Sequence, residues 1–223
     1  MTDGERPVQS SAAITSTRPG TEARALPAGA RAVQASVLFL ALIFLFLHLP
    51  YLPRSLEDLD SINFALGVRH FDVAQHQPHP PGYPVFIAVA KAMRAIAGSE
   101  LTALALVSVV SGALGVAAIA WVFAGLDRRD RRWTAWLPPT IVAMTAPLYW
   151  FTAVRPLSDM AGLAAALAVQ ALTLSARTPV TYVAAAFAAG VASGLRSQVA
   201  WLTLPLLIVK GLGAWGWGLG AWG

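Results

Sequence analysis

The stretch AVQASVLFLALIFLFLHLPYL, residues 32–52, contains no charged side chain. A helix needs about 20 apolar residues to cross the hydrocarbon core of a bilayer, and this segment is long enough to do so. Arg24 and Arg31 precede it, and positive charge before a first span favours a cytoplasmic N-terminus. We therefore expect the segment to cross the membrane and to place residues 53–80 on the outer side.

The composition of the whole chain supports a membrane protein. Of 223 residues, 57% are hydrophobic and 12% are charged, which is about half of the roughly 25% typical of soluble domains. The chain has no cysteine, which excludes disulfides, thiolate metal sites and a cysteine nucleophile. Its net charge is +5, but the arginines cluster between apolar segments, where membrane orientation explains them. We therefore expect no nucleic-acid partner.

The two ends of the chain differ from the apolar middle. Residues 1–31 are rich in Ala, Ser, Thr, Pro and Gly without an apolar period, which predicts a disordered tail. The tail is not a signal peptide, because the apolar run starts too late. A membrane module is expected over residues 32–210. Residues 211–223 repeat GLGAWG, and because each glycine costs about 1 kcal/mol in a helix relative to alanine, we interpret this end as the truncated start of a longer segment.

The orientation of the later spans depends on residues 82–97. This segment is apolar but contains Lys91 and Arg94, each of which costs about 2.5–3.5 kcal/mol at a bilayer centre. A helix lying on the outer surface avoids that cost. It also places the basic loop 127–133 inside, after a span at 101–125, as the positive-inside rule requires. The alternative, a full span at 82–97, would invert everything downstream.

The remaining apolar segments complete the predicted fold. Spans are expected at 134–151, 160–174, 180–195 and 199–209. The predicted fold class is all-α, a polytopic transmembrane helix bundle with a juxtamembrane helix on the outer face. In this topology the spans are nearly free of charge, and the outer face collects Glu57, Asp58, Asp60, Arg69, His70, Asp72, His76, His79, Arg155, Asp159 and Arg196.

Two aspartates open the first outer loop. Ser55 followed by Asp58 fits a capping box that would start a helix at 56–69, so Asp58 is either a helix cap or a site residue. Asp60 would then lie in the second helical turn, where the helix dipole gives a carboxylate little stabilisation. An acid near a membrane surface without such an explanation is a functional candidate.

The loop continues with HQPHPPGYP, residues 76–84. Its prolines stiffen the chain, and Pro84 is tolerated in the first turn of a helix. His76 and His79 are three residues apart and could bind a metal or a phosphate, although two histidines do not complete a metal site. The alternative is that both are solvated loop residues.

The motif RPLSD, residues 155–159, adds Arg155 and Asp159. Pro156 is expected to begin a helix with Asp159 in its first turn, where the dipole favours an acid. Arg155 and Arg196 are candidate phosphate ligands, because the planar guanidinium binds two oxygens. For each arginine the alternative is an anchor that extends to the membrane surface.

The motifs EDLDSINFA (57–65), PHPPGYPVF (78–86) and RPLSD, with the long first span and the basic inner loop, resemble the N-terminal module of the C-type (GT-C) integral-membrane glycosyltransferases. This group includes protein O-mannosyltransferases and aminoarabinose lipid A transferases. The resemblance covers residues 32–210. It implies transfer of a sugar from a polyprenyl-phosphate donor to an acceptor on the outer face of an inner or plasma membrane.

The resemblance also implies roles for individual residues. The catalytic or metal-organising acid of the first loop falls on Asp60, with Asp58 as second choice, and Asp159 matches an acid of the second outer loop. Some members bind a divalent metal such as Mg or Mn and others do not, so no metal follows from the motifs. The implied partners are a lipid-linked sugar donor, membrane lipid, and a glycan, lipid or protein acceptor.

A second interpretation belongs to a different class. The chain could be a non-catalytic membrane subunit or a transporter-like bundle in which the acids only cap helices. A transporter is expected to carry ionisable residues near the membrane midplane. Here they lie at the predicted outer ends of the spans, which favours the enzyme over the transporter.

Overall fold

The computed structural model describes residues 28–126 and 135–214, and within these ranges the protein is all-α, as predicted. Residues 1–27 of the predicted tail (1–31), residues 127–134, which include the basic loop 127–133, and residues 215–223 of the Gly/Trp-rich end (211–223) lie outside the described residues. Residues 28–31, predicted as part of the disordered tail, instead belong to the first helix. The elements are α1 (Ala28–His48), the 3-10 helix η1 (Leu49–Tyr51), α2 (Leu59–Arg69), the 3-10 helix η2 (Val73–Gln75), α3 (Pro84–Ala97), α4 (Glu100–Leu126), α5 (Leu137–Thr145), α6 (Pro147–Thr152), α7 (Asp159–Ser175), α8 (Pro179–Ser193) and α9 (Val199–Ala214).

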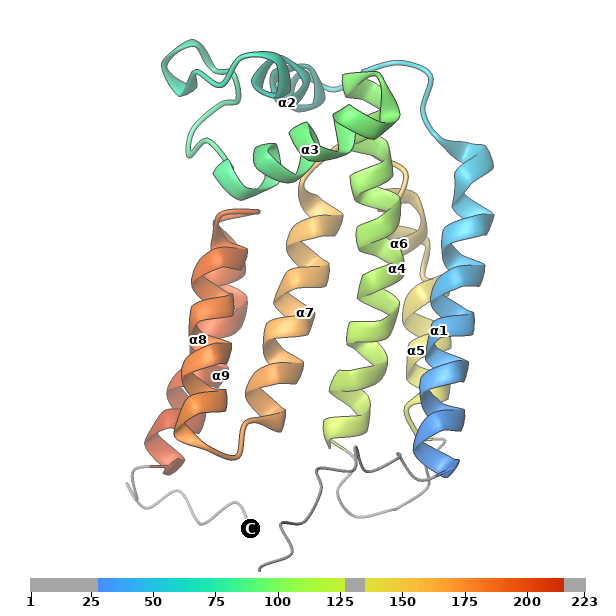
Figure 1. The fold of residues 1–223 in the computed structure, drawn as a ribbon, viewed down its shortest axis with the longest axis vertical. Coiled ribbons are helices and arrows are strands. Elements are labelled where there is room, and N and C mark those ends of the chain that lie inside the picture. Colours follow the sequence, from blue (N-terminus) through green and yellow to red (C-terminus); the bar gives the residue numbers. More distant parts are fainter. Residues whose placement is uncertain (1–27, 127–134, 215–223) are drawn as a thin grey trace, which may run out of the picture.

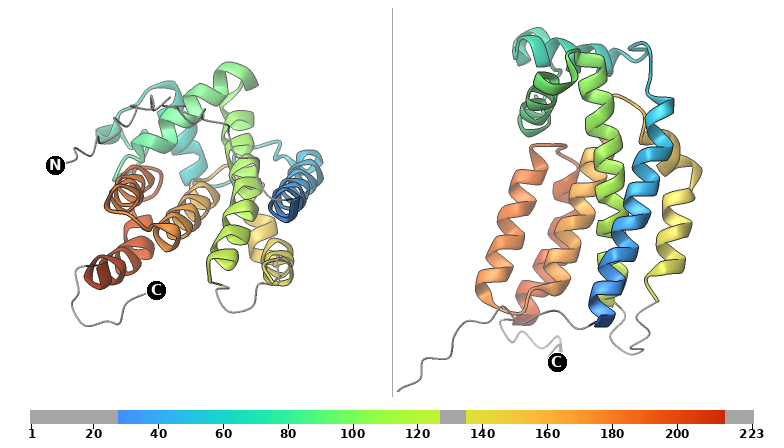
Figure 2. Two further views of the ribbon diagram at one scale, coloured as in Figure 1. Left: turned by 60° about the horizontal axis from the view of Figure 1, so that its bottom comes forward. Right: turned by 45° about the vertical axis from the view of Figure 1, so that its right-hand side comes forward.

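The helices form a bundle that is covered at one end. The long helices α1, α4, α7, α8 and α9 run side by side, and α2 and α3 lie across the end where α1 finishes and α4 begins (Figures 1 and 2). We call residues 59–97, which contain α2, η2 and α3, the cap layer. Because α3 crosses the bundle end and does not run along its flank, its orientation agrees with a surface helix. Its position relative to a membrane stays a prediction.

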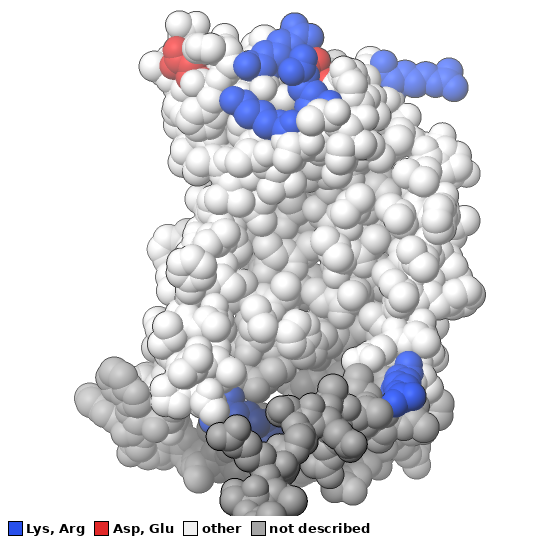
Figure 3. Space-filling view, in the orientation of Figure 1, with Lys and Arg blue, Asp and Glu red and all other residues white. Residues whose placement is uncertain are grey.

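Apolar surface covers the flank of the bundle. Two helices are long and apolar enough to cross a membrane, residues 31–51 and 100–126, each with a mean hydropathy of 2.3. Helices α7, α8 and α9 are apolar but shorter. Large side chains are exposed on the flank, among them Phe39 (63%), Phe187 (73%) and Trp201 (79%). In the view of Figure 3, charged side chains occupy the two ends and leave the middle uncharged. An apolar flank between two charged ends is the surface expected of a membrane protein.

Small residues bring α1, α4 and α6 into close contact. The hydroxyl of Tyr149 on α6 donates to the Gly112 carbonyl of α4 at 2.6 Å. A Cβ atom on Gly112 would lie 2.6 Å from a ring carbon of Phe44 on α1 and 3.3 Å from Ala153. Gly112 is therefore required by this packing, as is usual where membrane helices approach closely.

Several predicted element bounds were wrong. The predicted first span, residues 32–52, agrees within one residue with the apolar span 31–51, although α1 itself runs from Ala28 to His48 and is followed by η1. The predicted span 134–151 is divided into α5 and α6 at Ala146, whose backbone is extended (ψ 132°). The cause is Pro147, because proline disfavours the helical conformation in the residue before it and donates no hydrogen bond. α9 continues to Ala214, beyond the predicted residue 209.

The Gly112 contact gives a first prediction. Gly112→Ala is expected to lower the free energy of unfolding by about 1–3 kcal/mol, because the new methyl group overlaps a buried aromatic ring. Gly190→Ala in α8 is the matched control, since nothing lies within 4 Å of a Cβ placed there, and it should be neutral or stabilise by up to about 1 kcal/mol. Unfolding in detergent micelles measures both changes. Equal effects of the two substitutions would contradict the close packing.

Candidate functional site

The candidate site lies where the cap layer meets the N-terminal end of α7 and the C-terminal end of α8. Two hydrogen bonds hold α3 there, because the backbone amides of Val85 and Phe86 donate to the Gly194 carbonyl at 3.0 and 3.4 Å. Gly194 directly follows α8, and a Cβ atom on it would lie 2.5 Å from Val85. This close approach brings residues of the first outer loop next to the loop before α7 and the turn after α8.

Tyr83, which directly precedes α3, is the residue on which the site converges. The charges of Arg196, Asp60 and Asp159 all affect its pKa, so Tyr83 is within electrostatic range of both the cap layer and the bundle. Burial raises the pKa of Tyr83 above its usual range, and the hydroxyl therefore keeps its proton at neutral pH. Its backbone is left-handed (φ 45°), a conformation that is uncommon for residues other than glycine and is often found at functional positions.

His79 connects Tyr83 to Asp60. Its Nε2 atom lies 3.2 Å from the Tyr83 hydroxyl oxygen, and its Nδ1 atom lies 3.7 Å from an Asp60 carboxylate oxygen. The second distance is longer than a hydrogen bond, and Nδ1 is buried without a hydrogen-bond partner. The Asp60 side chain is 59% exposed. It can therefore contact both His79 and a molecule that arrives from solvent.

Asp58 forms a link between the cap layer and the bundle. It occupies the N-cap position of α2, but its side chain makes no capping hydrogen bond. Instead it accepts a hydrogen bond from Arg155 Nη2 at 2.7 Å, across 97 positions of sequence. The predicted capping box is therefore wrong, because Ser55 donates to Glu57 at 3.2 Å and the helix begins at Leu59 rather than residue 56.

The later start of α2 also changes the interpretation of Asp60. Asp60 lies in the first turn of the helix and not, as predicted, in the second. The helix dipole stabilises a carboxylate in the first turn, so Asp60 has a structural explanation that the sequence analysis did not give it. Its exposure and its position beside His79 are what keep it a candidate.

Asp159 pairs with Arg196 at the N-terminus of α7. The Arg196 Nη2 atom lies 3.1 Å from an Asp159 carboxylate oxygen, and Arg196 Nη1 donates to the Ser158 hydroxyl at 3.1 Å. α7 begins at Asp159, so the predicted start at Pro156 was wrong. Glycine at position 162 leaves room for the Arg196 side chain, since a Cβ atom on Gly162 would lie 2.9 Å from Arg196 Cβ.

Several outer-face residues do not join this cluster, among them His76 and Asp72. The His76 side chain is exposed and makes no hydrogen bond or ion pair with any residue in the described ranges. The Asp72 carboxylate accepts from the backbone amides of Ala74 and Gln75 at 3.0 and 3.3 Å, so it caps η2. Sequence analysis did not select Tyr83 or Ser158, although both belong to the quoted motifs.

A metal site does not emerge from the same residues. Within residues 28–126 and 135–214, no group of three His, Asp or Glu side chains is placed to hold a metal ion. A divalent metal such as Mg or Mn therefore stays a prediction, without a ligand set among the described residues.

One family of known proteins matches the chain. Residues 74–178, a little under half of the sequence, match the family model described as Protein O-mannosyl-transferase TMEM260 N-terminal domain. No curated protein and no solved structure matches. The matched range contains His79, Arg155 and Asp159 but neither Asp58 nor Asp60. The match indicates a relation to mannosyltransferases, and thus to glycosyltransferases in general.

The ion pair between Asp58 and Arg155 gives a second prediction. Because the two side chains are 42% and 51% exposed, a double-mutant cycle with Asp58→Ala and Arg155→Ala should give a coupling free energy of about 0.2–1 kcal/mol. The coupling should weaken as salt is added. The same cycle with Asp58 and Arg196 is the control and should give none. Additive effects of Asp58→Ala and Arg155→Ala would show that the pair does not form.

Proposed function

We propose that this chain is a membrane glycosyltransferase, or the N-terminal part of one, that transfers mannose from a polyprenyl-phosphate donor to an acceptor hydroxyl. The observation that carries the proposal is the position of Asp60. It is an exposed carboxylate beside His79 and Tyr83, at the same end of the bundle as Arg155 and Arg196. The match of residues 74–178 to a protein O-mannosyltransferase domain supports the choice of sugar and reaction.

Asp60 is the proposed general base. The acceptor oxygen forms a bond to the anomeric carbon of the sugar while the bond from that carbon to the phosphate oxygen breaks. The acceptor proton passes to Asp60, and the electron pair of the broken bond remains on the polyprenyl phosphate. A base must come within about 2.6–3.2 Å of the group whose proton it takes, and the 59% exposure of Asp60 leaves room for a hydroxyl at that distance.

Arg155 and Arg196 are the proposed ligands of the donor phosphate. Each already holds one carboxylate, Asp58 and Asp159 respectively. A guanidinium has five N–H donors, so each arginine can also bind a phosphate oxygen. Positive groups close to the leaving phosphate stabilise the negative charge that develops on it as the bond breaks. His79 neighbours this region, and His76 does not contribute in this arrangement.

We also propose that the cap layer lies on the outer side of the membrane. The α1 end that carries Arg31 is opposite the cap layer (Figure 1), and a positive N-terminal flank stays in the cytoplasm. The chain then passes outward through α1, inward through α4, outward through α5 and α6, inward through α7, outward through α8 and inward through α9. The apolar flanks of α8 and α9 support their assignment as spans, although they are short.

Cysteine labelling tests the sidedness, because the chain has no native cysteine. Ser55 and Ser175 are both exposed and lie at opposite ends of the bundle. A membrane-impermeant maleimide should label the Ser55→Cys variant in intact cells and the Ser175→Cys variant only after permeabilisation. The reverse pattern would place the cap layer in the cytoplasm and contradict the proposal.

Transfer of labelled mannose tests the catalytic role of Asp60. Asp60→Asn should reduce transfer from polyprenyl-phosphate mannose by about 100-fold or more, the usual contribution of a general base. Glu57→Gln is the matched control, because Glu57 is an exposed carboxylate just before α2 that accepts a hydrogen bond from Ser55. It should retain nearly full activity in membranes with equal amounts of protein. Equal transfer by Asp60→Asn and the unaltered chain would remove Asp60 from the mechanism.

A non-catalytic membrane subunit is the second candidate. The observation that favours it is that both arginines of the site are paired with carboxylates, Arg155 with Asp58 and Arg196 with Asp159, as expected of links that only hold helices together. In that case Asp60→Asn would leave the activity of the assembled complex unchanged. The transfer assay therefore separates the two candidates.

A further inference from the structure

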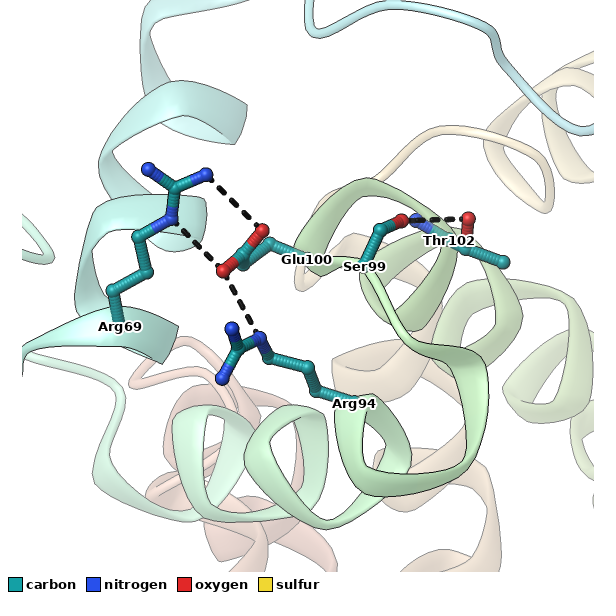
Figure 4. A network of polar contacts seen from close by, with 5 residues as sticks. All are labelled: Arg69, Arg94, Ser99, Glu100 and Thr102. Carbon is teal, nitrogen blue, oxygen red and sulfur yellow. Dashed lines mark hydrogen bonds and ion pairs between the residues drawn. The ribbon is translucent and has the colours of Figure 1, made fainter.

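A second cluster of charged side chains lies where three helix ends meet. Arg69 is in the last turn of α2, Arg94 is in the last turn of α3, and Glu100 is the first residue of α4. Arg69 donates to the two Glu100 oxygens at 2.8 and 3.2 Å, and Arg94 Nε lies 2.9 Å from one of the same oxygens. The two guanidinium groups approach the carboxylate from different sides (Figure 4).

This cluster carries excess positive charge at the surface. The Glu100 side chain is 11% exposed, whereas Arg69 is 65% and Arg94 is 46% exposed. Two exposed positive charges therefore surround one nearly buried negative charge, which leaves a net charge of +1 at the surface. Each guanidinium has five N–H donors. Glu100 accepts hydrogen bonds from two N–H groups of Arg69 and forms an ion pair with Arg94. In the part of the chain that the structure describes, neither arginine has another hydrogen bond or ion pair.

The faces of α3 place this cluster at the boundary between lipid and water. Lys91 and Arg94 are three residues apart, so they share one flank of the helix, and both are exposed. Val89 and Ile96 are seven residues apart and share the other flank, where they are 42% and 84% exposed. The buried face between the two flanks contains Ala90. A helix with one apolar and one cationic flank is typical of the membrane interface.

We propose that Arg69, Lys91 and Arg94 bind the headgroup phosphate of an anionic phospholipid in the membrane leaflet next to the cap layer. The guanidinium fork suits a phosphate. Glu100 already fixes both arginines, so less conformational freedom is lost when the phosphate binds. The free donors of the arginines can reach the lipid without breaking their bonds to Glu100.

This lipid site is separate from the candidate catalytic site. Asp58 and Asp60 lie at the start of α2 and Arg69 at its end, which is about 15 Å along a helix of this length. Tyr83 precedes α3 and Arg94 lies in its last turn, a separation of about 16 Å. One phosphate cannot contact both clusters. The proposal therefore requires the membrane placement of the chain but not its glycosyltransferase activity.

Lipid binding to the purified chain tests the proposal. The protein is delipidated in neutral detergent, and binding of phosphatidylglycerol and phosphatidylcholine is compared by native mass spectrometry. The double variant Lys91→Gln/Arg94→Gln should bind phosphatidylglycerol at least tenfold more weakly, while binding of phosphatidylcholine stays unchanged. Arg54→Gln, which removes an exposed cation before α2, is the matched control and should bind like the unaltered chain.

Further measurements distinguish folding and other sources of phosphate. If the double variant unfolds at lower temperature, Lys91→Gln alone is used, because Lys91 forms no ion pair with any residue that the structure describes. About a threefold loss of phosphatidylglycerol binding is then expected. Undiminished phosphatidylglycerol binding in a folded variant would overturn the proposal. Displacement of phosphatidylglycerol by millimolar inorganic phosphate would overturn the proposal as well, because the cluster would then be a general phosphate site. Loss of mannose transfer with unchanged phosphatidylglycerol binding would assign the cations to the donor instead.

Discussion

The contact between α3 and the Gly194 carbonyl is the constraint on which the rest of the candidate site depends. The amides at the start of an α-helix have no partner within the helix, and here Val85 and Phe86 direct theirs to the turn after α8. Only glycine at position 194 permits the approach. Without this contact, Tyr83 would not lie within the electrostatic influence of Arg196 and Asp159, and the chain would have two unrelated polar loops.

The ion pairs of the site and the cluster at Glu100 hold the cap layer at its two ends. Asp58 and Arg155 connect the start of α2 to the loop before α7, and Glu100 connects the ends of α2 and α3 to α4. Exposed pairs of this kind contribute little stability individually. Their more important effect is to fix the cap layer in position, while Asp60 remains open to solvent and forms no ion pair with any arginine among residues 28–126 and 135–214.

The sequence predicted the all-α fold, but it did not predict which side chains pair with one another. The all-α fold and the gathering of Asp60, Asp159 and Arg196 at one end follow from apolar length and loop charge. The start of α2 was wrong because Ser55 bonds to Glu57 and not to the helix, which no spacing rule predicts. The pairing of Arg155 with Asp58 could not be predicted either, because it joins residues 97 positions apart that only the folded chain brings together.

In the proposed function, a lipid-linked sugar binds between the cap layer and the bundle end. A polyprenyl-phosphate mannose analogue with a photoreactive group on the sugar tests it most directly, by mapping the crosslinked peptides of the purified chain. If the donor binds at this site, adducts should form in both residues 55–83 and residues 153–197, and they should be lost when unlabelled donor is added in excess. Adducts confined to the opposite end of the bundle, or to α1 and α4 alone, would contradict it.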